Sequence, residues 1–316
     1  MFAPLETGLG LDIILWLQQF RSGFVDTILY MLNFAGGELF YIALLAAVYW
    51  LFNKRLGIRM LFALILISIL NSIFKDLLAR PRPYEMSDAF TPLVIEHSYG
   101  IPSGHVAYAT MVWGYLAVSL RKRWLTIGAI IYITLQFFGR MIAGVHYPED
   151  VVAGLILASI TLVLYVSYVE KVVDFWKKQS LSIQIAIPVA LTIMGLILIS
   201  VIPLQQNQID AYGTLLGLLW GAGLAAAIEA RYIRFQVHDS RLIQVIQYVI
   251  GIGLAVVLLK GMGIAFDVIS QTGVLGSFLR IIRYGLLAFF ALAIWPYLSI
   301  RFNLMEADIK ENTSTA

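Results

Sequence analysis

The chain has 316 residues, of which 60% are hydrophobic and 13% are charged, and its formal net charge is +3. A soluble domain carries about a quarter charged residues, so this composition excludes an ordinary soluble protein and predicts a polytopic membrane protein. The chain has no cysteine, which excludes disulfides, thiolate zinc sites and a cysteine nucleophile. No block of like charge indicates a nucleic-acid partner.

The first 36 residues are expected to form a separate N-terminal element. Their apolar stretch, 11–32, is interrupted by Gln18, Gln19, Arg21 and Asp26. Because these polar residues interrupt the apolar stretch, although they do not form one clean helical face, we expect a single amphipathic helix in the membrane interface, with a spanning helix as the alternative.

Nine apolar segments follow, each long enough to be read as a membrane span. They lie at 37–53, 57–79, 103–120, 124–141, 149–169, 182–202, 211–230, 243–264 and 279–300. The sequence therefore predicts an all-α membrane protein with a five-span core at 37–169, a four-span extension at 170–305 and a polar tail at 306–316.

Loop charge predicts the orientation in the membrane. The basic residues between spans gather on one side of the predicted bundle, which we expect to be cytoplasmic together with the C-terminus. These residues are Lys54, Arg55, Arg59, Arg121, Lys122, Arg123, Lys171, Lys177, Lys178, Arg231, Arg234, Arg241 and Arg301. The opposite loops at 203–210 and 265–278 contain no Lys or Arg.

Three clusters of ionisable residues lie at the other, extracytoplasmic side. In the first, Lys75 and Arg82 are about two helical turns apart, and Pro81 and Pro83 stop the helix and fix the backbone around Arg82. Cations that snorkel at a helix end are the alternative.

The second cluster, Pro102-Ser103-Gly104-His105, opens an apolar helix. Ser103 can cap this helix, and Gly104 lets a ligand approach the backbone closely. The unpaired N–H groups of a helix N-terminus suit an anion, which His105 can reach. An ordinary Ser-capped helix is the alternative.

The third cluster contains Arg140, His146 and Asp150. Pro148 predicts a helix start, so His146 lies just before the helix and Asp150 in its first turn. Asp150 can accept a proton from one ring nitrogen of His146 and leave the other free to attack. A structural His–Asp pair is the alternative, but it does not explain Arg140. Ionisable residues at membrane depth are functional by default, so the joint pattern favours a phosphate site.

These clusters resemble the motifs of the type 2 phosphatidic acid phosphatase (PAP2) family: K-x6-RP, PSGH and SR-x5-H-x3-D. Lys75 through Pro83, Pro102 through His105 and Arg140 through Asp150 match them, with Gly139 where the family usually has serine. The resemblance covers roughly 37–169, and we expect the departure at Gly139 to tune the site without abolishing it.

The resemblance implies a role for each residue, with no metal and no cofactor. His146 would be the nucleophile that forms a phosphohistidine, Asp150 would orient it, and His105 would protonate the leaving oxygen and later activate water. Phosphoryl transfer needs mainly positioning and charge stabilisation. The phosphoryl oxygens would be held by Lys75, Arg82, Ser103, Gly104 and Arg140.

The extension resembles glucose-6-phosphatases in its span layout. Most of its ionisable residues, among them Glu229, are expected to be interfacial anchors, whereas Arg280 and Arg283 are candidates for a head-group contact. In the core, the loop at 84–101 can act as a lid, although we expect its residues, Glu96 included, to be simply solvated.

The favoured function is hydrolysis of a lipid phosphate or diphosphate on the extracytoplasmic face. Candidate substrates are phosphatidate, phosphatidylglycerophosphate and polyprenyl diphosphate, and the expected partners are this substrate and membrane lipids. The alternatives are a sugar-phosphate phosphatase, a lipid phosphotransferase and a non-catalytic phospholipid-binding or transport protein. The sequence does not determine the oligomeric state.

Overall fold

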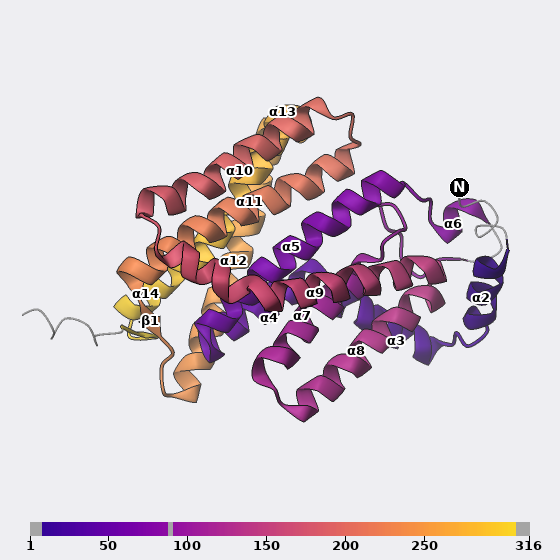
Figure 1. Cartoon of the computed structure of the whole chain (residues 1–316), viewed down its shortest axis with the longest axis horizontal. Coiled ribbons are helices and arrows are strands. Elements are labelled where there is room, and N and C mark those ends of the chain that lie inside the picture. Colours follow the sequence, from indigo (N-terminus) through magenta and orange to yellow (C-terminus); the bar gives the residue numbers. More distant parts are fainter. Residues whose placement is uncertain (1–7, 88–90, 308–316) are drawn as a thin grey trace, which may run out of the picture. The chain divides into compact units, whose positions relative to one another are not determined.

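The computed structural model describes residues 8–87 and 91–307, and most of them lie in helices (Figure 1). Contacts within the chain divide it into two compact units. Unit 1 comprises Met1–Ile42 and Met60–Glu170, and unit 2 comprises Ala43–Arg59 and Lys171–Ala316. The core expected at 37–169 includes 43–59, whereas the structure groups this segment with the C-terminal half.

The first half of the chain contains eight α-helices and one π-helical turn within the described residues. They are α2 (Leu9–Gln18), α3 (Gly23–Ala35), α4 (Glu38–Ala47), η1 (Val48–Phe52), α5 (Lys54–Leu78), α6 (Pro83–Met86), α7 (Gly104–Leu120), α8 (Arg123–Ile142) and α9 (Pro148–Lys177).

The single helix expected over 11–32 is wrong, because the structure divides this stretch into α2 and α3. Ser22 caps α3 by accepting a hydrogen bond from the backbone N–H of Val25 at 3.3 Å. Arg21 pairs with Asp26 in the first turn of α3, at 2.9 Å. The polar residues that interrupt the apolar stretch therefore mark a helix break.

Small residues let α5, α7 and α9 pack closely in unit 1. Their shared core contains Ala63 and Ile67 of α5, Ala107 and Met111 of α7, and Ala158 of α9. One turn earlier on α9, a Cβ at Gly154 would lie 2.6 Å from the carbonyl oxygen of Ser103. The missing side chain lets the start of α7 rest directly on α9.

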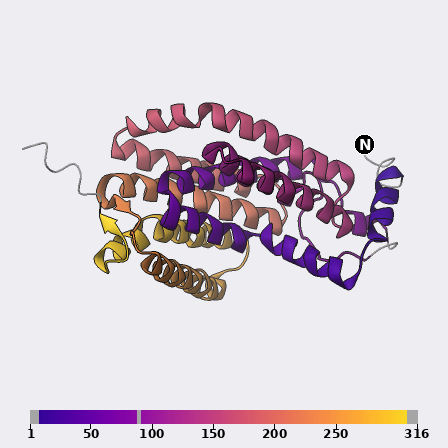
Figure 2. The same ribbon diagram turned by 90° about the horizontal axis from the view of Figure 1, so that it is seen from below.

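Helix α2 lies across one end of unit 1, with its axis at a steep angle to those of the long helices (Figures 1 and 2). Its Ile14 packs with Tyr147, and both side chains are completely buried. Its Leu17 packs with Val106 and Val151, from α7 and α9. The N-terminal element therefore covers the segment between α8 and α9.

Unit 2 contains the four-helix extension. Its elements after residue 177 are α10 (Leu181–Val201), α11 (Gln206–Ile228), η2 (Glu229–Ile233), α12 (Arg241–Ile269), α13 (Gly273–Phe289), η3 (Phe290–Ile294) and α14 (Trp295–Arg301), with the antiparallel strands β1 (Phe235–Gln236) and β2 (Glu306–Ala307).

Glycines hold α11 against α13. A Cβ at Gly217 would lie 2.6 Å from the carbonyl oxygen of Ile281, and one at Gly221 would lie 2.1 Å from that of Gly285. Such close backbone approach is typical of helix pairs in membranes, where packing rather than the hydrophobic effect drives association.

Within the described residues, seven helices are long and apolar enough to cross a membrane, so the chain is an all-α, multi-pass membrane protein. They correspond to seven of the nine expected spans. The expected span at 103–120 is α7, which has only 17 residues. The expected span at 37–53 follows α3 after a bend of 59°. If α3 and this segment together form one span, the number of candidate spans among the described residues is eight. Of the predicted polar tail, 308–316 lies outside the described residues.

Candidate active site

The three clusters of ionisable residues meet in unit 1, because Arg82 lies 3.4 Å from His146 and the backbone N–H of Ser103 donates to Asp150 O at 2.9 Å. Each side chain is held at a helix terminus: Lys75 in the last turn of α5, Arg82 just before α6, Ser103 and Gly104 at the start of α7, Arg140 in the last turn of α8, and His146 and Asp150 around the start of α9. Helix ends leave unpaired backbone groups, so polar side chains gather there.

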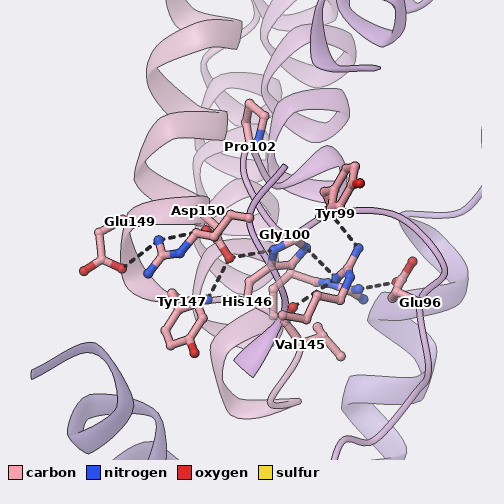
Figure 3. A network of polar contacts seen from close by, with 12 residues as sticks. Glu96, Tyr99, Gly100, Pro102, Val145, His146, Tyr147, Glu149 and Asp150 are labelled. Carbon is pink, nitrogen blue, oxygen red and sulfur yellow. Dashed lines mark hydrogen bonds and ion pairs between the residues drawn. The ribbon is translucent and has the colours of Figure 1, made fainter. Parts of the chain in front are cut away.

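His146 and Asp150 form the pair that the spacing predicts. The Nδ1 atom of His146 lies 3.2 Å from Oδ2 of Asp150, and both residues are buried. The same carboxylate oxygen accepts the backbone N–H of Tyr147 at 2.9 Å (Figure 3). On the other side of the imidazole, Nε2 lies 3.4 Å from a guanidinium nitrogen of Arg82. The ring is thus fixed with Nε2 facing a cation.

Lys75, Arg82 and Arg140, which we call the cation cluster, are almost completely buried. Lys75 donates to the carbonyl oxygens of Tyr99 and Gly100. Arg82 donates to the carbonyl oxygens of Ser98 at 2.6 Å and Tyr99 at 3.3 Å, to Ser98 Oγ at 3.1 Å and to Val145 O at 2.9 Å. The loop before α7 therefore lies directly against two of these cations.

Ser103 and Gly104 form the start of α7. Ser103 is fully buried, its backbone N–H donates to Asp150 O at 2.9 Å, and its Oγ has no hydrogen-bond partner among the described residues. Ser103 is the residue just before the helix, but its side chain makes no capping hydrogen bond, contrary to the expectation from the sequence. A buried hydroxyl of this kind is available to a ligand.

His105 lies one residue further along α7, and its Nε2 is 3.4 Å from the carbonyl oxygen of Asn33. A Cβ at Gly36 would lie 2.2 Å from the His105 ring, so the end of α3 packs against this histidine. Among the described residues, His105 makes no hydrogen bond to His146. The structure places both rings in the same unit without joining them directly.

Arg140 donates to Asn33 Oδ1 at 2.6 Å and to the carboxylate of Glu96. The expectation that Glu96 is simply solvated is wrong, because its carboxylate pairs with a buried guanidinium. Glu96 lies 44 positions from Arg140, and Asn33 lies 107 positions away. No local pattern connects residues so far apart, although an acidic residue between two cationic motifs is a signal that could have drawn attention.

Arg80 is a second residue that sequence reasoning left without a role. Its guanidinium lies 3.2 Å from Oδ1 of Asp150 and 3.4 Å from Glu149, and it stacks 4.2 Å from the centre of the Tyr147 ring. Asp150 is thus held between a cation and the His146 imidazole. The position of Arg80 inside the first motif, next to Pro81, could have indicated that it belongs to the site.

Gly139 lies near the end of α8, against α3. A Cβ there would be 3.3 Å from a methyl group of Leu32 and 3.4 Å from one of Leu29. Apolar side chains of α3 therefore cover the position where the family usually has serine.

Burial and neighbouring charges set the ionisation of two loop groups. Burial lowers the pKa of His146 well below its ordinary value, and Arg82, Lys75 and Arg140 lower it further. A neutral imidazole has a lone pair on one nitrogen, which a nucleophile needs. Burial raises the pKa of Glu96, but Arg140 and other nearby cations outweigh it and lower that pKa to about 2.

The described residues contain no cluster of three or more His, Asp or Glu side chains that could hold a metal ion.

In unit 2, the interpretation of Glu229 as an interfacial anchor is wrong, because it is buried and pairs with Lys54 at 2.9 Å. Arg280 pairs with Asp210 at 2.8 Å, and Arg283 lies 5.0 Å from the centre of the Tyr284 ring. The suggested head-group contact of the two arginines stays a prediction.

Comparison with known proteins identifies two matching regions. Residues 56–174 match the model of the PAP2 superfamily, and 209–307 match the transmembrane extension of PAP2 superfamily phosphatases. The first region contains all three clusters, and the second contains most of the four-helix extension.

Three curated relatives are similar to parts of the chain. It is 30% identical over 169 residues to a probable sphingosine-1-phosphate phosphatase of Dictyostelium discoideum, covering 49% of this chain and 41% of the relative. It is 27% identical over 190 residues to lipid phosphate phosphatase delta of Arabidopsis thaliana, covering 55% and 45%. It is 31% identical over 119 residues to phosphatidylglycerophosphatase B of Bacillus subtilis, covering 35% and 56%.

The chain thus spans about half the length of the curated relatives it matches. The two family models, however, cover well over half of its own 316 residues, and both describe the same superfamily. From these matches and the order and spacing of the three clusters, we conclude that the chain belongs to the PAP2 superfamily.

Proposed function

We propose that this protein is an integral-membrane phosphatase that hydrolyses a lipid phosphate or diphosphate through a phosphohistidine intermediate. The observation that carries the proposal is the environment of His146. Its Nδ1 faces the Asp150 carboxylate at 3.2 Å, whereas its Nε2 faces Arg82 at 3.4 Å. A phosphate held by Arg82 would therefore lie next to the ring nitrogen that carries the lone pair.

In the first step, Nε2 of His146 attacks phosphorus, the N–P bond forms and the bond to the leaving oxygen breaks. His105 donates a proton to that oxygen. Asp150 accepts the Nδ1 proton in a hydrogen bond and stabilises the positive charge that the ring acquires. Negative charge on the phosphoryl oxygens is balanced by the cation cluster and by hydrogen bonds from Ser103 and the start of α7.

In the second step, His105 takes a proton from water, whose oxygen attacks phosphorus as the N–P bond breaks. The products are inorganic phosphate and neutral His146. An acceptor alcohol in place of water would give a phosphotransferase with the same residues.

A lipid substrate is supported by two observations. The site lies at the ends of apolar helices, so a substrate whose tail stays in the bilayer can present its phosphate there. The three relatives named above carry names of lipid phosphate phosphatases. Phosphatidate, phosphatidylglycerophosphate and polyprenyl diphosphate are the candidates, and the distribution of loop charge favours reaction on the extracytoplasmic face.

Phosphate release by the purified protein tests this proposal. The protein would be offered each candidate lipid and glucose 6-phosphate in the presence of EDTA. We expect release from at least one lipid, loss of release in His146→Ala, and retention in His238→Gln, which changes a histidine near the start of α12. Activity that survives in His146→Ala, or that requires added metal, would contradict the mechanism. Release from glucose 6-phosphate alone would favour a sugar-phosphate phosphatase.

A further inference from the structure

Arg140 differs from the other members of the cation cluster in the charge of its partner. Lys75 and Arg82 donate mainly to neutral backbone carbonyl oxygens. Arg140 donates instead to the carboxylate of Glu96, while its other terminal nitrogen is held by Asn33. Its Nε has no hydrogen-bond partner among the described residues.

The backbone of Glu96 is fixed, whereas its side chain reaches the edge of the site. The Tyr84 hydroxyl donates to Glu96 O at 2.8 Å and accepts the Glu96 N–H at 3.2 Å. The Glu96 side chain is 26% exposed, against 3% for that of Arg140. Rotation about the side-chain bonds can therefore withdraw the carboxylate toward solvent without moving the loop.

A carboxylate and a phosphoryl group offer a guanidinium the same kind of acceptor, two anionic oxygens in one plane. We propose that Glu96 competes with phosphate for Arg140, leaving it when phosphate binds and returning to it when inorganic phosphate departs. The identity of Arg140 as a phosphate ligand rests on the proposed function. Glu96 is then a residue that limits the affinity of the site for phosphate.

The need for such a residue follows from the charges. Three buried cations and a helix N-terminus favour any phosphate dianion, including the inorganic phosphate that hydrolysis leaves behind. A lipid substrate is also held by its tail, but inorganic phosphate is held by its charge alone. The Glu96 carboxylate on Arg140 therefore costs inorganic phosphate a larger fraction of its binding free energy than it costs the lipid substrate.

Orthophosphate binding tests the inference without any turnover. Binding of radiolabelled orthophosphate to the full chain in detergent would be measured by equilibrium dialysis for wild type and Glu96→Gln. We expect roughly tenfold tighter binding by the variant, since one hydrogen bond between charged groups no longer competes. During hydrolysis, the same change would strengthen product inhibition by orthophosphate to a similar extent.

Asp174→Asn is the matched control, because Asp174 is 66% exposed on α9 and its change removes the same charge. We expect its phosphate affinity to stay at the wild-type value. Unchanged or weaker binding by folded Glu96→Gln would overturn the inference, and so would equal tightening in Asp174→Asn. If Glu96→Gln does not fold, Glu96→Asp, whose shorter side chain draws the carboxylate back from Arg140, must show tightening in the same direction.

The two proposals fail separately. If orthophosphate binds more tightly to Glu96→Gln but no offered substrate is hydrolysed, the proposed function fails and the competition stands. If lipid phosphate is hydrolysed but phosphate affinity does not depend on Glu96, the competition alone fails.

Discussion

Arg80 connects the two acidic residues at the start of α9. Its guanidinium lies within 3.4 Å of both Glu149 and Asp150 and stacks on Tyr147. Asp150 in turn contacts the imidazole of His146, so Arg80 acts on the reacting histidine through Asp150. We therefore regard it as a positioning residue for the His146–Asp150 pair.

Replacement of Arg80 should slow the chemical step. In Arg80→Met we expect kcat to fall roughly 10- to 100-fold, since a hydrogen bond to a charged group contributes about 1.5–3 kcal/mol. KM should change little, because the phosphate contacts remain. Arg80→Lys keeps the charge and should recover part of kcat. Steady-state kinetics of the three proteins check this, and an equal loss in both variants, or a loss confined to KM, would refute the positioning role.

The depressed pKa of His146 makes folding sensitive to acid. Below the ordinary histidine pKa of 6.5, the unfolded chain binds a proton at this position, whereas the folded protein does not. Stability should therefore decrease as pH falls, by up to about 1.4 kcal/mol per pH unit from this group. His146→Gln removes that contribution.

Thermal unfolding in detergent between about pH 6.5 and pH 4.5 measures the effect. The melting temperature of His146→Gln should fall less steeply with decreasing pH than that of the wild type. Parallel slopes would show that the imidazole is not held neutral by the fold.

At the scale of helices, residues within one short cluster could be predicted from the sequence. Pro148 places Asp150 one helical turn after His146, and this spacing alone predicts their contact. The roles of these residues remain predictions. The contacts that Arg80 and Asn33 make with the site could not be predicted in this way. Arg80 is 70 positions from Asp150, and Asn33 is 107 positions from Arg140. Contacts between distant segments depend on how the helices pack, which local spacing does not encode.

The contact between α7 and α9 should tolerate no side chain at Gly154. A Cβ there would lie 2.6 Å from the backbone of Ser103, which cannot withdraw without moving the start of α7. We expect Gly154→Ala to lower stability by about 1–3 kcal/mol, as overpacking does, and to reduce phosphate binding. Thermal unfolding and orthophosphate dialysis would measure both.

Gly128→Ala provides the matched control for this prediction. It changes a glycine of α8 whose Cβ would meet nothing within 4 Å, so it should leave phosphate binding intact and stabilise the helix slightly. Wild-type stability and binding in Gly154→Ala would show that the two helices are not in the close contact described.

For the whole molecule, most of the spans expected from the sequence correspond to long apolar helices. Apolar composition predicts seven segments that form helices long and apolar enough to cross a membrane. The expected span at 37–53 follows a bend of 59° after α3, where Gly36 and Gly37 separate two apolar arms that hydropathy alone reads as separate segments. The expected span at 103–120 forms α7, whose 17 residues are at the lower end of the length that crosses a bilayer.

Orientation in the membrane is a prediction for the complete chain. Basic loops at 121–123 and 231–241 should face the cytoplasm, and so should the C-terminus. A reporter fused after Ala316 should be active only in the cytoplasm, and one inserted at 203–210 only on the opposite side. The reverse pattern would place the site on the cytoplasmic face and remove the extracytoplasmic part of the proposed function.

The bare α-carbon of Gly154 also extends the sequence signature of this site. His146, Asp150 and Gly154 follow one another at intervals of four residues, and Asp150 and Gly154 both contact Ser103 at the start of α7 from successive turns of α9. In a library randomised at these positions and selected for function, the third should return glycine as strictly as the first returns histidine. For this protein, the motif is then best written H-x3-D-x3-G, with a residue that performs no chemistry as its last letter.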